Sequence, residues 1–90
     1  MEKETIFRKI CLILYEVGSA DEDAEGNFFT TGPVKEKITE ETRIVEDLDC
    51  SSFQMMEMEM EIDNELQVEV DMWGIKTVGD ILKCIEEAIN

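Results

Sequence analysis

Three stretches of the chain place apolar residues three or four positions apart, the spacing that puts them on one face of an α-helix. The first stretch predicts a helix that stops at Gly18, because glycine favours helix ends. The last predicts a helix capped by Thr77, with Asp80 three residues further on as in a weak capping box. The core-facing positions are Ile6, Ile10, Ile13, Leu14 and Val17, and then Val78, Ile81, Leu82, Ile85 and Ile89.

The middle stretch, SFQMMEMEMEIDNEL, predicts a helix over residues 52–66 because it has no glycine or proline and one β-branched residue. Its start is marked by Ser51 and Gln54, which match a capping box in which Ser51 is the N-cap and Gln54 reaches back to it. Ser52 then takes the first helical position, and its hydroxyl is left free.

This middle helix carries two apolar stripes. We expect one stripe to face the core and the other to form a docking surface rimmed by Glu57, Glu61 and Asp63. The alternative is that a neighbouring helix covers both stripes. The core stripe is Met55, Met58, Ile62 and Leu66, and the second stripe is Phe53, Met56 and Met60.

The remaining segments lack a sustained period. Residues 18–37 contain three of the five glycines and the only proline, and predict a long loop from which Phe28 or Phe29 packs back onto the domain. Residues 38–48 predict an ordered connection, and residues 67–76 have room for one helical turn. We therefore predict an all-α fold for a single domain over residues 1–90: a small bundle of three main helices and one short helix.

Charge and composition narrow the function. The net charge of −15 excludes nucleic acid and favours basic protein surfaces, although simple solubility is an alternative reading. With no histidine, and with three cysteines in no C-x-x-C pattern, the sequence predicts no metal site and no disulfide. The N-terminus has the pattern of neither a signal peptide nor a membrane span, so a cytoplasmic protein without membrane insertion is expected. We also expect a monomer.

Two further readings concern candidate sites. Residues 21–32, DEDAEGNFFTTG, match the start of a calcium-binding loop, but Gly32 stands where the bidentate glutamate is required. No histidine or cysteine base lies near Ser52 in the sequence, which argues against an enzyme. A hydroxyl at the first helical position lies beside unpaired backbone N–H groups that stabilise a phosphate ester, although a plain surface serine has the same pattern.

Residues 44–66, IVEDLDCSSFQMMEMEMEIDNEL, resemble the core of acyl carrier proteins. Val45-Glu46-Asp47-Leu48 matches the turn of that family, and Ser52 falls on its modified serine. The resemblance implies a 4′-phosphopantetheine arm on Ser52, installed from coenzyme A by a phosphopantetheinyl transferase. The arm would hold acyl groups as thioesters for the acyl-transferring and acyl-modifying enzymes of lipid, fatty acid or polyketide-type synthesis.

The resemblance also assigns roles on the middle helix, which would meet basic docking patches on partner enzymes. The implied recognition residues are Phe53, Met56, Glu57, Met60 and Asp63. Two departures stand out: the usual aspartate before the modified serine is Ser51, and the next acidic position is Gln54. They indicate a specialised carrier, with a calcium-binding protein using the loop Asp21–Gly32 and an unmodified interaction module as alternatives.

Overall fold

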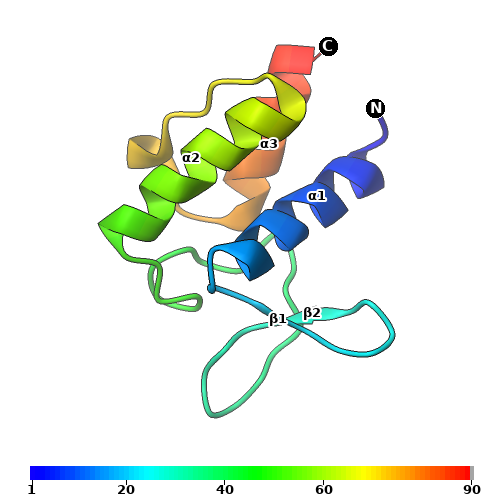
Figure 1. The fold of residues 1–90 in the computed structure, drawn as a ribbon, viewed down its shortest axis with the longest axis vertical. Helices are drawn as coiled ribbons and strands as arrows, with labels where there is room; N and C mark the ends of the chain where they lie inside the picture. Colours follow the sequence, from blue (N-terminus) through cyan, green and yellow to red (C-terminus); the bar gives the residue numbers. More distant parts are fainter. Residues whose placement is uncertain (90) are drawn as a thin grey trace.

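The computed structural model describes residues 1–89 and contains three α-helices, a short 3-10 helix and one small hairpin (Figure 1). Asn90, the last residue of the expected domain, lies outside the described residues. The elements are α1 (Lys3–Glu16), β1 (Asp21–Glu22), β2 (Phe28–Phe29), α2 (Ser52–Leu66), η1 (Met72–Gly74) and α3 (Val78–Ile89). The predicted helical bundle, with three main helices and one short one, is confirmed.

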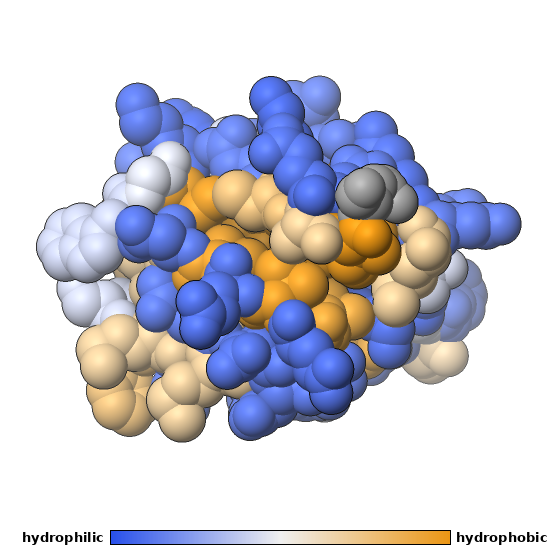
Figure 2. Space-filling view, turned by 90° about the horizontal axis from the view of Figure 1, so that it is seen from above, coloured by the Kyte–Doolittle hydropathy of each residue, from blue (hydrophilic) through white to orange (hydrophobic). Residues whose placement is uncertain are grey.

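The core is formed where the three helices meet (Figure 1). Figure 2 looks onto the end of the bundle where α1 begins and α3 ends, and shows hydrophobic residues framed by hydrophilic ones. Ile89, predicted as a core residue, is 37% exposed because it lies in the last turn of α3. The largest fully buried side chains are Ile6, Ile10, Leu14, Ile44, Leu48, Met58, Ile62, Ile81, Leu82 and Ile85.

The long loop over residues 18–37 contains a hairpin that the sequence pattern did not predict. Strands β1 and β2 pair antiparallel and have two residues each, which is too short to produce a detectable alternation of apolar and polar residues. Phe28 is buried, as expected of one phenylalanine in this loop, and the guanidinium of Arg8 lies 5.6 Å from the centre of its ring. The hairpin is therefore packed against α1.

Residues 38–50 connect the hairpin to α2 and pair with the start of α3. The N–H of Ile44 donates to the carbonyl of Lys76 at 2.9 Å, and the N–H of Gly79 donates to the carbonyl of Glu40 at 2.8 Å. A Cβ at position 79 would lie 2.9 Å from that carbonyl oxygen, so only glycine permits this approach. The connection is thus fixed on α3 before it turns into α2.

Candidate functional site around Ser52

A compact turn delivers the chain to Ser52. Asp47 accepts hydrogen bonds from the backbone N–H of Arg43 at 2.8 Å and from its guanidinium at 2.9 and 3.2 Å. These bonds hold the pKa of the Asp47 carboxyl below its usual value. Two residues later Asp49 adopts a left-handed conformation with φ of 52°, which aspartate tolerates, and the chain reverses toward α2.

Ser51 and Gln54 form a complete capping box at the start of α2. The Gln54 N–H donates to Ser51 Oγ at 3.1 Å, and the Ser51 N–H donates to Gln54 Oε1 at 2.9 Å. Both bonds satisfy backbone donors that a helix terminus otherwise leaves free. Ser52 follows as the first residue of α2, and it is exposed.

Two side-chain contacts join this helix start to the end of α1, and neither was predicted from the sequence. Gln54 Nε2 donates to the carbonyl of Val17 at 3.1 Å, and Cys50 Sγ donates to Ser19 Oγ at 3.2 Å. Burial raises the pKa of the Cys50 thiol, which stays protonated as a donor. The residues on both sides of Ser52 are therefore attached to the segment that leaves α1.

The two apolar stripes of α2 have different surroundings. Met58 and Ile62 are fully buried, and Met55 and Leu66 pack partly buried against the same core. The second stripe is exposed: Phe53, Met56 and Met60 are 69%, 61% and 64% accessible. Within residues 1–89, no neighbouring helix covers it. Three large apolar side chains therefore remain available on the helix that begins with Ser52.

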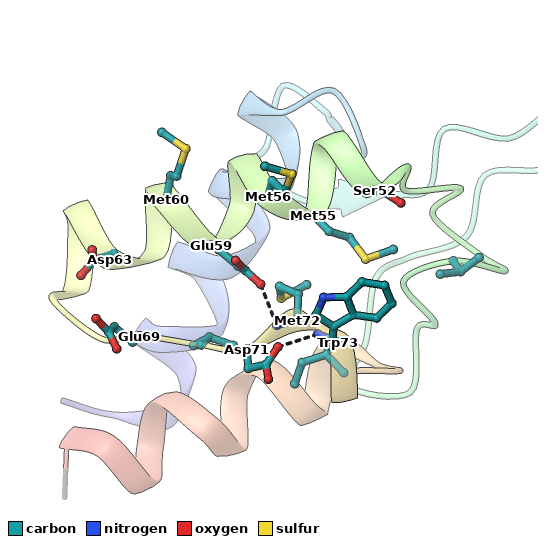
Figure 3. A pocket seen from close by; sticks show the side chains of 13 residues that line it. Ser52, Met55, Met56, Glu59, Met60, Asp63, Glu69, Asp71, Met72 and Trp73 are labelled. Carbon is teal, nitrogen blue, oxygen red and sulfur yellow. Dashed lines mark hydrogen bonds between the residues drawn. The ribbon is translucent and has the colours of Figure 1, made fainter.

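A cleft of about 870 Å³ opens beside Ser52, between α2 and the segment 69–75 that contains η1 (Figure 3). Ser52 lies at one end, Asp63 and Glu69 lie at the other, and Glu59 lies between them. Four of the six methionines line it, namely Met55, Met56, Met60 and Met72. Trp73, on η1, lies at its edge and is 95% exposed.

The sequence reasoning missed this cleft. Met55 was predicted to face the core; it packs half-buried against the core and also lines the cleft. The wall of the cleft that faces α2 depends on the path of residues 67–77. These residues have no periodic pattern that would reveal their position. The sequence offers no signal for this wall beyond the single tryptophan in a segment without a periodic pattern.

Two carboxylates of the acidic segment Asp21–Gly32 bind groups of the protein itself. Asp21 forms an ion pair with Lys35, and Asp23 Oδ1 accepts from the N–H groups of Glu25 and Asn27 at 2.9 and 2.8 Å. These backbone bonds lower the pKa of the Asp23 carboxyl. Across residues 1–89, no three histidine, cysteine or acidic side chains are grouped so as to hold a metal ion.

Comparison with known proteins identifies the family. The chain is 30% identical over 91 residues to an acyl carrier protein of Thermotoga maritima, and the match covers 98% of this chain and 96% of that protein. The chain belongs to the acyl carrier protein family. An acyl carrier protein of Clostridium perfringens is 36% identical over 56 residues, covering 59% of this chain and 74% of that protein. No family model matches.

Membership of the acyl carrier protein family supports a carrier role rather than catalysis. It confirms the family to which the turn and serine motif pointed. No helix among the described residues is long and apolar enough to cross a membrane.

Proposed function

We propose that this member of the acyl carrier protein family carries acyl groups on a 4′-phosphopantetheine arm attached to Ser52 Oγ. The observation that carries this proposal is the setting of Ser52: an exposed hydroxyl in the first turn of α2, at the end of a cleft. When bound, the arm supplies a terminal thiol that holds an acyl group as a thioester.

The residues around Ser52 suit a phosphodiester. The helix that begins with Ser52 is capped by the neutral Ser51, whose partner in the capping box is the neutral Gln54. The first turn of α2 therefore contains no carboxylate. The positive end of the helix dipole and the backbone N–H groups of the first turn are therefore left to stabilise an anion on Ser52. Ser52 is exposed at the end of the cleft, where a transferase can reach it.

The charge of α2 suits partners with basic surfaces. Between Arg43 and Lys76 the chain has ten acidic residues and no basic one, and five of the ten lie on α2. The recognition surface consists of Phe53, Met56 and Met60 together with Glu57 and Asp63. We expect a phosphopantetheinyl transferase and acyl-transferring or acyl-modifying enzymes to dock there, with apolar contacts giving affinity and charge giving orientation.

The neutral residues Ser51 and Gln54 favour a specialised carrier that serves one biosynthetic pathway. The carrier consists of a single domain. A transferase or partner enzyme that reads negative charge directly before the modified serine finds none here. The pathway of lipid, fatty acid or polyketide-type synthesis is set by those partners. A cytoplasmic monomer is the expected form of the protein.

Intact-mass measurement after incubation with coenzyme A and a broad-specificity phosphopantetheinyl transferase tests the proposal. We expect the parent and Ser51→Ala to gain one phosphopantetheine and Ser52→Ala to gain none. Circular dichroism of each variant establishes that the fold is retained. A folded parent that gains no mass with this transferase, or with transferases from the same organism, would instead favour an unmodified interaction module.

A further inference from the structure

Glu59 is a charged residue in the middle of the methionine-lined cleft. It is half-buried and lies seven residues after Ser52 on the same face of α2. A helix rises 1.5 Å per residue, so Glu59 is displaced by roughly 10 Å along the axis from Ser52. Its side chain leans toward the N-terminus of α2, as helical side chains do, and so toward Ser52.

The carboxylate of Glu59 is fixed across the cleft. Its Oε1 accepts the backbone N–H of Met72 at 2.8 Å (Figure 3). Met72 is buried, and the adjoining Asp71 side chain accepts the N–H of Trp73 at 3.0 Å, so the facing wall is itself held in place. The second oxygen, Oε2, has no hydrogen-bond donor within residues 1–89.

When an apolar ligand fills a cleft, it displaces the water around a carboxylate there. The carboxylate then needs a hydrogen-bond donor on the ligand itself. The phosphopantetheine arm has that composition, because two amide N–H groups alternate along it with methylene and dimethyl groups. An extended chain advances by about 1.2 Å per bond. The two amide nitrogens of an extended arm therefore lie roughly 8 and 13 Å from Ser52 Oγ. That interval includes the position of Glu59.

On the basis of the proposed attachment at Ser52, we infer that Glu59 binds the arm itself. Glu59 Oε2 accepts an amide N–H of the arm, while the thioether of Met55, which points toward Trp73 across the cleft, contacts its apolar groups (Figure 3). Flexible methionine side chains adapt to such an irregular chain. The cleft is thus a resting site for the arm outside the bundle core, and partner enzymes must withdraw the arm from it.

Trp73 provides a direct readout, because it is the only tryptophan and lies 95% exposed at the edge of the cleft. We expect acrylamide to quench its fluorescence less efficiently in the protein with the arm than in the protein without it. Nuclear Overhauser effects should also connect arm protons with the side chains of Met55 or Trp73 in the modified parent. Neither measurement depends on enzymatic activity.

Glu59→Gln is the informative variant. The amide keeps one acceptor for the Met72 N–H but replaces the second oxygen with a donor, so the arm N–H loses its acceptor while the facing wall is retained. Glu61→Gln removes the same charge from α2 at a residue that does not line the cleft. We expect the shielding of Trp73 to be lost in modified Glu59→Gln and kept in modified Glu61→Gln, with equal quenching of all three unmodified proteins.

The outcomes separate this inference from the proposed function. A parent that gains no mass overturns both. A modified parent in which Trp73 is quenched as in the unmodified protein, and in which no arm contacts are detected, overturns only the inference. Equal shielding in modified parent and modified Glu59→Gln also overturns it, because the arm would then be held without the Glu59 acceptor.

Discussion

Replacing Gln54 with glutamate should destabilise the protein, although glutamate is a common residue at this position of a capping box. A glutamate oxygen can still accept the N–H of Ser51. It cannot replace Nε2, which donates to the part-buried carbonyl of Val17 at 3.1 Å. The substitution therefore keeps the local cap and removes the contact that joins α2 to the end of α1.

The magnitude follows from two opposing contributions. Loss of one hydrogen bond that leaves a part-buried carbonyl without its donor costs about 1–2 kcal/mol. A negative charge in the first turn of a helix stabilises the folded protein by about 0.5 kcal/mol through the helix dipole. The expected net loss for Gln54→Glu is about 1 kcal/mol. Gln54→Ala also leaves the Ser51 N–H without its acceptor, and should cost about 2 kcal/mol.

Urea unfolding followed by far-ultraviolet circular dichroism measures these losses. Trp73 is a poor reporter of unfolding because it is already exposed in the folded protein. Measurements repeated at about 1 M salt, where the Debye length is roughly 3 Å, remove the repulsion between a new carboxylate and the other acidic residues. A Gln54→Glu protein as stable as the parent at high salt would refute a stabilising Gln54–Val17 contact.

Two further predictions concern packing and pH. Met58→Ala should lower the free energy of unfolding by about 2–5 kcal/mol because Met58 is fully buried, whereas Met56→Ala, on the exposed stripe, should change it by no more than about 0.5 kcal/mol in the same urea experiment. Asp80 accepts the N–H groups of Lys76 and Thr77, which lowers the pKa of its carboxyl, so its stabilisation is present above about pH 4 and is lost as the pH falls through the lower folded value. The stability difference between the parent and Asp80→Asn should therefore shrink below about pH 4, and a difference that stays constant down to pH 2 would contradict the assignment.

The start of α2 could be predicted from the sequence because it is governed by chemistry within four residues. Ser51 and Gln54 need only each other and the backbone between them, and the helix that follows has strong propensity. The two stripes followed from the same regular geometry. The bonds from Gln54 to Val17 and from Cys50 to Ser19 could not be predicted, because they join residues more than thirty positions apart.

The cleft and the hairpin could not be predicted from the sequence for a related reason. Residues 69–75 are placed by the bond from the Met72 N–H to Glu59 and by the pairing of residues 42–44 with 76–78, which are tertiary contacts. Strands of two residues in the hairpin are stabilised by the burial of Phe28 and by the turn around Asp23, and not by an alternating pattern. A periodicity argument detects neither.

The distribution of negative charge around Ser52 connects the cap with the proposed attachment. In a protein with a net charge of −15, a phosphodiester on any surface serine faces general repulsion. At Ser52 that repulsion is reduced locally, because the cap and its partner are neutral and the nearby Asp47 is paired with Arg43. The acidic residues of α2 begin at Glu57, more than one helical turn further along. The helix thus presents its positive end to the proposed arm and its acidic surface to basic partners.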